Sequence, residues 1–299
     1  MEMRQALCEC LDEMMAENEN IVVIDADLAK PNGTFPLRKK YPERAIDVGI
    51  AEQNMASVAA GMSSYGFIPF ITSFTPFASR RICDQIAISI AYAKQNVKII
   101  GSDPGISAEF NGGTHMSMED IGVLRSIPEL VIYEPVDVAQ FKQALPQIVA
   151  YEGPVYIRMF RKTIDDVFTD ANYKFDLFGA DCIQEGTAVT IFCSGIMVQE
   201  TMKANEILKQ EGIDAEIINI HTIKPIDRDA VVASAKKTGA VVVAENHNVI
   251  GGLTSAVCEV LMEEYPVPLR AVGVKDRFGQ VGKMPFLKEE YHMTAKDIV

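Results

Sequence analysis

In the first half of the chain, short runs of apolar and β-branched residues alternate with longer stretches of helical character. The runs predicted as strands are 21–27, 45–50, 68–74, 96–103, 130–135 and 154–160, and the predicted helices between them include 52–64, 80–94 and 137–150. Nearly continuous apolar strands joined by helices are typical of βαβ units, in which a parallel sheet is covered on both faces. The pattern predicts a doubly wound α/β domain over residues 1–165.

The periodic pattern is lost after residue 160, where charges, aromatic residues and glycines follow one another without regularity. We interpret residues 166–177 as a linker. A second βαβ series then has predicted strands at 188–195, 214–220 and 239–246, a helix to about 211, and a helix after Gly251-Gly252. Asp227 is a suitable N-cap for a further helix. The fold prediction is therefore α/β with two doubly wound domains: a mainly parallel sheet in residues 1–165, and a smaller mixed or parallel sheet in residues 178–299.

Composition narrows the class of protein without deciding its function. Of the 299 residues, 48% are hydrophobic and 23% charged, which is typical of a soluble globular protein. The net charge of -13 argues against non-specific nucleic-acid binding, which needs a basic surface. No run reaches the roughly 18 apolar residues of a membrane span, and the acidic, helical start is unlike a targeting peptide. Six cysteines without CxxC spacing favour reduced thiols. We expect a cytoplasmic protein.

Acidic residues follow several of the predicted strands. Asp25 and Asp27 end the first strand, Glu52 follows the second and Asp103 ends the fourth. Each one alone is better explained as a helix cap or a solvated loop residue than as a catalytic group. Because ligands of open parallel sheets bind at the carboxyl ends of the strands, these residues together predict one crevice.

Two further segments carry candidate chemistry. "FNGGTHMSMED" (110–120) places His115 after two glycines, which allow close backbone approach. Phe74 and Phe77 lie three residues apart just after a predicted strand, where they are either core residues or the walls of a site for a flat ring. No His, Asp or Glu spacing matches a metal site, so we predict no metal ligands in this chain.

Five motifs in this order resemble the C-terminal half of a transketolase. They are "ADLAKPNGT" (26–34), "VGIAEQNMA" (48–56), "FITSFTPFASRR" (70–81), "FNGGTHMSMEDIGVLRSIP" (110–128) and "HTIKPIDRD" (221–229). The resemblance covers nearly the whole chain. It implies a pyrimidine-binding domain, a transketolase C-terminal domain, and thiamine diphosphate as cofactor.

The resemblance also implies roles for the candidate residues. Glu52 matches the glutamate that holds the N1′ atom of the aminopyrimidine ring, and a carboxyl in apolar surroundings can share a proton with such a nitrogen. Ile50 matches the bulky residue that supports the bent cofactor. Phe74 and Phe77 match aromatic residues around the pyrimidine, and Asp27 matches a carboxylate near the thiazolium.

For the substrate, His115 matches a histidine that binds donor hydroxyls and helps proton transfer. Asn111 stands where the family motif has aspartate. Arg4 and Arg161 match arginines that bind a sugar phosphate. Two positions depart from the family: Pro31 replaces a serine, and Asp103 replaces a histidine, at sites that contact the acceptor phosphate. The sequence therefore predicts an acceptor outside the standard pentose-phosphate set, such as a branched or sulfonated sugar, unless other groups replace these contacts.

In this family a "GDG" motif followed by asparagine binds the diphosphate and Mg²⁺, and no GDG occurs in the sequence. We therefore expect an N-terminal partner subunit that carries the Mg²⁺ ligands, with two copies of each chain in a heterotetramer. The predicted reaction moves a two-carbon ketol unit from a ketose to an aldose. The alternatives are a 2-oxoacid dehydrogenase β-type subunit, half of a 1-deoxyxylulose-5-phosphate synthase, or a non-catalytic scaffold protein that keeps the fold.

Overall fold

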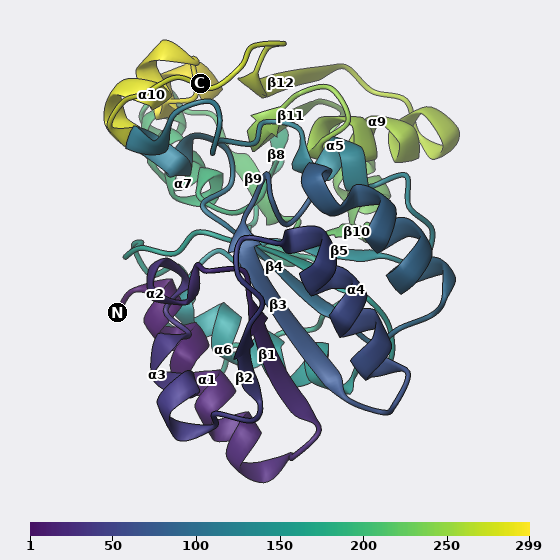
Figure 1. The fold of residues 1–299 in the computed structure, drawn as a ribbon. Coiled ribbons are helices and arrows are strands. Elements are labelled where there is room, and N and C mark those ends of the chain that lie inside the picture. Colours follow the sequence, from purple (N-terminus) through teal and green to yellow (C-terminus); the bar gives the residue numbers. More distant parts are fainter. The chain divides into compact units, whose positions relative to one another are not determined.

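A parallel sheet with helices on both faces is the centre of the first unit of the computed structural model, which contains residues 1–104 and 123–175 (Figure 1). The structure describes residues 1–299. Within this unit the strand order is β5-β6-β4-β3-β1-β2, and every pair in it is parallel. Helix α4 packs on β3 and η2, whereas α1 packs on α6.

The elements of this unit follow the alternation expected from the sequence. They are α1 (Met3–Glu17), β1 (Ile21–Asp25), α2 (Ala29–Asn32), α3 (Phe35–Lys40), β2 (Ala45–Asp47), α4 (Glu52–Ser63), β3 (Ile68–Phe74), the 3₁₀-helix η1 (Arg80–Ile82), the π-helix η2 (Gln85–Tyr92), β4 (Lys98–Ser102), β5 (Val131–Tyr133), α6 (Val138–Ala150) and β6 (Val155–Met159). Strands β1, β4 and β6 are buried at every residue, which explains their unbroken apolar character.

The register of the sheet places the carboxyl ends of its central strands at one edge. Asp25 is paired with Thr72, and Phe74 with Ser102, which is paired in turn with Met159. Residues that immediately follow these strands therefore lie close together.

The second unit contains residues 105–122 and 176–299. Its five-stranded sheet has the order β12-β11-β8-β9-β7, with β7 antiparallel to β9 and the other pairs parallel. Its elements are the 3₁₀ segment η3 (Gly105–Asn111), α5 (Asp120–Leu124, which ends in the first unit), β7 (Asp181–Gln184), β8 (Val189–Cys193), α7 (Met197–Gln210), β9 (Ala215–Asn219), β10 (Thr222–Lys224), α8 (Arg228–Thr238), β11 (Val241–Asn248), α9 (Leu253–Glu264), β12 (Leu269–Val274), α10 (Met284–Glu290) and α11 (Ala295–Ile298).

The predicted fold class, α/β with a mainly parallel and a smaller mixed sheet, is confirmed, and local details differ. The helix predicted at 80–94 is a 3₁₀ turn followed by a π-helix. The strand predicted at 45–50 ends at Asp47. Strand β7 lies in the irregular stretch after residue 160 and was not predicted, because its residues are only partly buried and lack alternation. None of the helices combines the length and apolar character needed to cross a bilayer.

Candidate active site

Glu52 is the first residue of α4, just past the carboxyl end of β2. Its side chain is only 5% exposed, and Arg81 Nη1 donates to its Oε1 at 2.7 Å. The position at a helix N-terminus favours a carboxylate, because the helix dipole is positive there. The surroundings are less apolar than the sequence suggested, since Arg81 provides a positive charge at this carboxylate.

Arg81 also links Glu52 to the two predicted aromatic residues. Its guanidinium carbon lies 3.7 Å from the centroid of the Phe77 ring, a cation–π contact. The centroids of Phe77 and Phe74 are 6.3 Å apart with the rings tilted by 49°. A buried carboxylate and two aromatic rings therefore lie along one continuous set of contacts.

The same line of contacts continues to Arg161 and Asp103. The guanidinium carbon of Arg161 lies 5.1 Å from the centroid of Phe74, and its Nε is 2.5 Å from Asp103 Oδ2. Burial raises the pKa of Asp103 above its ordinary value, and the charge of Arg161 partly offsets this. Asp103 has a left-handed backbone with φ 53°, which is strained for a residue with a side chain.

Arg4 and Pro31 complete what we term the Arg4–Arg161 cluster (Arg4, Pro31, Asp103 and Arg161). The backbone N–H of Arg4 donates to the Arg161 carbonyl at 3.0 Å. Both guanidinium groups donate to the Pro31 carbonyl, each at 3.4 Å. Gly33 lies so close to Arg4 that a Cβ there would come within 2.5 Å of the Arg4 carbonyl oxygen. The two arginines and the two positions that depart from the family motif therefore lie together.

Asp27 and Ile50 lie on loops joined by one carboxylate. The side chain of Asp47 accepts from the backbone N–H of Asp27 at 3.1 Å and of Gly49 at 2.7 Å, and it pairs with Arg38. Burial raises the pKa of Asp47, but these hydrogen bonds outweigh it and lower the pKa overall. Ile50 is 77% exposed.

Asn111 and His115 belong to the second unit, on the segment 105–122. Asn111 is exposed at the end of η3, and His115 is half-buried in a turn in which its N–H donates to the Gly112 carbonyl at 3.0 Å. Thr114 Oγ1 lies 2.8 Å from His115 Nδ1. Backbone strain is present here too, because Glu109 has φ 48°.

Comparison with known proteins identifies the family. A model described as the pyrimidine-binding domain of transketolase matches residues 1–165, and a model of the transketolase C-terminal domain matches residues 179–298. The chain belongs to the transketolase family. As a transketolase chain it is 53% identical over 297 residues to the 6-deoxy-6-sulfo-D-fructose transketolase subunit SqwH of Clostridium sp. (strain MSTE9), covering 99% of this chain and 92% of the relative.

Two further relatives agree in length with this transketolase chain. A putative transketolase C-terminal section of Methanocaldococcus jannaschii is 38% identical over 298 residues, covering 99% of this chain and 93% of the relative. A solved structure described as a split gene transketolase, inactive β4 tetramer, superimposes with a TM-score of 0.90 at 42% identity, covering 100% of this chain and 96% of that one. The sequence relatives and the solved structure therefore agree on the fold and the family of this chain.

Sequence reasoning missed two features of this transketolase chain. Arg81 lies in the quoted motif 70–81 but received no role, because its contact with Glu52 joins two elements. Asn246 and His247 near the end of β11 were also unassigned, although they bond to Ile106 and Gly122 at the two ends of the segment that carries His115. Neither contact has a signal in local periodicity.

One group of possible metal ligands lies in the second unit. Cys182, Glu185 and Glu216 bring their ligand atoms within 4.8 Å of one another. Lys237 forms ion pairs with both carboxylates, at 2.8 Å for Glu216. The lysine already supplies the positive charge, so we assign the group to an ion-pair network.

Proposed function

We propose that this chain is the C-terminal subunit of a split, thiamine diphosphate-dependent transketolase that moves a two-carbon ketol unit from a ketose to an aldose. The observation that supports the proposal most strongly is the unbroken set of contacts from the buried Glu52 through Arg81, Phe77 and Phe74 to Arg161. It joins a buried carboxylate, two aromatic rings and two guanidinium groups within one unit.

The side chains around Glu52 fit the aminopyrimidine half of thiamine diphosphate. Glu52 offers a buried carboxylate to a ring nitrogen, Phe74 and Phe77 offer flat apolar faces, and exposed Ile50 offers a support next to Glu52. The backbone N–H of Asp27 donates to the Asp47 carboxylate, which also accepts from the N–H of Gly49, next to Ile50. When bound, the cofactor supplies a carbon nucleophile that accepts and passes on the two-carbon unit. The role of Glu52 is to hold and exchange a proton with the pyrimidine nitrogen.

The partner requirement is supported by the relatives. One is named as a transketolase subunit and another as a C-terminal section, and each matches this chain over more than nine-tenths of its own length. We propose that an N-terminal subunit carries the ligands for the diphosphate and Mg²⁺, and that two copies of each chain form a cytoplasmic heterotetramer.

In the working complex, we assign binding of donor hydroxyls to His115 and Asn111. His115 also serves as a proton donor or acceptor, because an imidazole nitrogen can either donate or accept a hydrogen bond. The Thr114 hydroxyl beside Nδ1 supports this role by fixing the orientation of the ring.

The Arg4–Arg161 cluster is proposed to bind the acidic end of the acceptor. Two guanidinium groups attract an anion, but Asp103 neutralises part of that charge at 2.5 Å from Arg161 Nε. A site with reduced positive charge favours a monoanion over a dianion. The relative that is 53% identical is named for a sulfo sugar, and a sulfonate is a monoanion, so we propose a sulfonated sugar as the physiological substrate.

The test is reconstitution with the N-terminal subunit, thiamine diphosphate and Mg²⁺, followed by assays with ketose donors and with phosphorylated, sulfonated and neutral aldose acceptors. Ketol transfer to an acidic aldose supports the proposal. Condensation of pyruvate with an aldose would instead indicate a 1-deoxyxylulose-5-phosphate synthase, and oxidation of a 2-oxoacid with a lipoyl acceptor would indicate a dehydrogenase subunit. If a folded complex bound the cofactor but had none of these three activities, the chain would be a non-catalytic scaffold protein that keeps the fold.

A further inference from the structure

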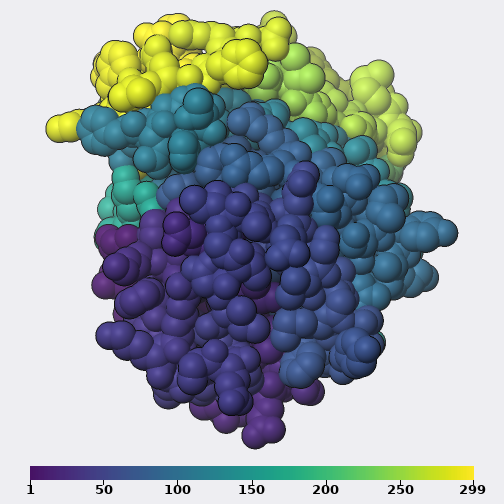
Figure 2. Space-filling model, in the orientation of Figure 1, coloured from purple at the N-terminus to yellow at the C-terminus, as the bar shows by residue number.

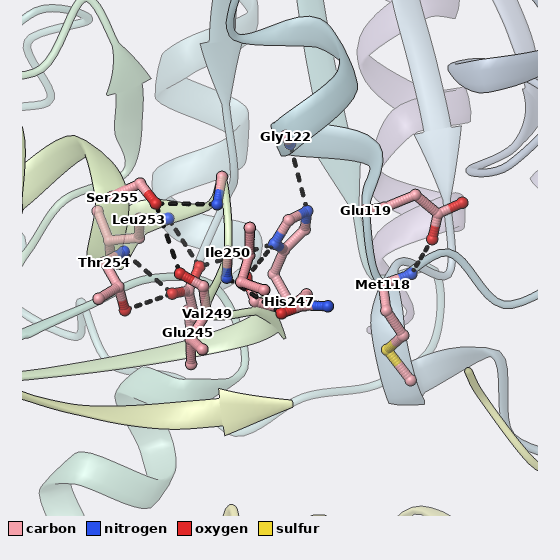
Figure 3. Close-up of polar contacts among 12 residues, drawn as sticks. Met118, Glu119, Gly122, Glu245, His247, Val249, Ile250, Leu253, Thr254 and Ser255 are labelled. Atoms are coloured by element: carbon pink, nitrogen blue, oxygen red, sulfur yellow. Dashed lines mark hydrogen bonds and ion pairs between the residues drawn. The ribbon is translucent and has the colours of Figure 1, made fainter. Parts of the chain in front are cut away.

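The segment that carries Asn111 and His115 is held by four consecutive residues at the carboxyl end of β11. We term residues 105–122 the His115 segment and Glu245–Asn248 the clamp, and both belong to the second unit. Figure 3 shows Gly122 of the segment joined to His247 of the clamp. The clamp is far away in sequence, so these contacts exist only in the folded unit.

Asn246 holds the beginning of the segment. Its Oδ1 accepts from the backbone N–H of Ile106 at 2.9 Å, across 140 residues of sequence. Gly105 packs so closely that a Cβ there would lie 2.2 Å from the same oxygen, and its φ of +55° also favours glycine. The N–H of Gly105 donates to the Ser117 carbonyl at 2.9 Å, which closes the segment into a loop.

His247 and Asn248 hold the end of the segment. His247 Nδ1 lies 2.6 Å from the Asn248 carbonyl oxygen, which only accepts, so Nδ1 carries the proton. The N–H of Gly122 points to Nε2 at 3.4 Å (Figure 3), and Asp120 Oδ1 lies 3.9 Å from the same nitrogen. Asn248 donates its N–H to the Met118 carbonyl at 2.8 Å. Both ends are therefore bonded to adjacent residues of one strand.

Glu245 fixes the clamp itself. Its carboxylate accepts from the backbone N–H groups of Leu253 at 2.6 Å and Thr254 at 3.0 Å, in the first turn of α9 (Figure 3). A Cβ at Gly252 would lie 2.0 Å from this carboxylate, so only glycine permits the approach. A fully buried charge is thus stabilised by helix N–H groups and the helix dipole.

The middle of the segment is supported by the end of the chain. The N–H of Met284 donates to Glu109 Oε1 at 3.0 Å, and Gly113 packs against the Gly279 carbonyl. In the space-filling view, blue atoms of the segment border the yellow atoms of the C-terminal residues (Figure 2). The clamp and the C-terminal residues together hold the segment to the second unit along its length.

We propose that the clamp positions His115 and Asn111 for the substrate, and that Asn246 and His247 act as positioning residues without touching it. The anchoring is a property of this chain alone, whereas its effect on catalysis rests on the proposed transketolase function. The second unit, which contains no proposed cofactor ligand, would thus control binding of the ketose donor.

The first experiment measures backbone amide hydrogen exchange in the full chain. Asn246→Ala and His247→Leu should each speed exchange of the amides in residues 105–122 by about tenfold, because each removes one hydrogen bond that holds the segment. Asn246→Asp and His247→Gln keep an acceptor and should restore protection. The control is Asn219→Ala, which removes a buried asparagine that bonds to Asp181 instead.

The second experiment compares kinetics of the reconstituted complex. Asn246→Ala should lower kcat/KM for the ketose donor by about tenfold or more, while cofactor affinity and proton exchange at the cofactor remain as in wild type. The clamp would be refuted if amide exchange in residues 105–122 stayed as slow as in wild type. It would also be refuted if exchange in β8 and β9 rose as much as exchange in residues 105–122. If exchange rose in residues 105–122 but kcat/KM for the ketose donor did not change, the positioning role of the clamp would be refuted. If the wild-type complex transferred no ketol unit, the proposed function would fail while the exchange result stood.

Discussion

Replacing Asp103 by asparagine removes one negative charge beside Arg161 and keeps the size of the side chain. Asp103 Oδ2 lies 2.5 Å from Arg161 Nε, so an anion bound on the outer side of that guanidinium would be roughly 6 Å from the carboxylate. Coulomb's law then gives about 0.7 kcal/mol in water-like surroundings, and about 3 kcal/mol at an effective dielectric constant of ~20, for each added unit of negative charge. The preference for a monoanion should therefore fall by roughly 3- to 100-fold.

The assay compares kcat/KM for a phosphorylated and a sulfonated acceptor of the same carbon skeleton in the reconstituted complex. Asp103→Asn should raise the phosphate-to-sulfonate ratio by that factor at about pH 7.5, where phosphate is mostly a dianion. Below about pH 6 the phosphate loses its second charge, so the wild-type preference should shrink. Asp12→Asn is the matched control, because it removes a carboxylate paired with Lys40 on the surface.

An unchanged ratio in a folded Asp103→Asn complex would refute the charge argument. The Pro31→Ser, Asp103→His double variant extends the test by restoring the groups that the family has at these positions. Full wild-type activity on ribose 5-phosphate, with no gain in the double variant, would show that these two positions do not determine acceptor choice.

Three further predictions test the cofactor site, the fold and the partner. Glu52→Gln should slow proton exchange at the reactive carbon of the cofactor by about 10²–10⁴-fold, because the amide cannot exchange a proton; an unchanged rate in the reconstituted complex would exclude this role. Burial raises the pKa of Asp25 to about 6, so folding stability should fall by about 3 kcal/mol as the pH rises from about 4 through 6. Urea unfolding at several pH values should show this loss in wild type but not in Asp25→Asn. The same dependence of stability on pH in both proteins would contradict the prediction. The chain alone, with thiamine diphosphate and Mg²⁺, should show no turnover, and measurable ketol transfer would disprove the need for a partner.

Much of the fold could be predicted because its signals are local. Strands such as β1 and β4 are buried on both faces, and only continuous apolar runs satisfy that environment. Asp227 was predicted as an N-cap, and its side chain accepts from the Ala230 N–H. Where the environment is mixed, as for the partly buried β7, the same signals are absent and the strand was missed.

The candidate site was only partly visible in the sequence. Motif order indicated Glu52, Phe74, Phe77, Arg4 and Arg161 through the family resemblance, and the alignment of parallel strands placed strand-end residues at one edge. Their assigned roles remain predictions. The ion pair of Asp103 with Arg161 could not be foreseen, because it depends on how β4 and β6 pair.

The sequence by itself determined the α/β alternation, the strand ends that carry acidic residues, and the family, because each depends on neighbouring residues or on motif order. Only the tertiary structure decided that Arg81 contacts Glu52 and that Asn246 holds Ile106 across 140 residues. The physical reason is that periodicity reports which face of an element is buried, but not which distant backbone groups will be its hydrogen-bond partners. Those partners are chosen when the elements pack, and they place the His115 segment in the second unit.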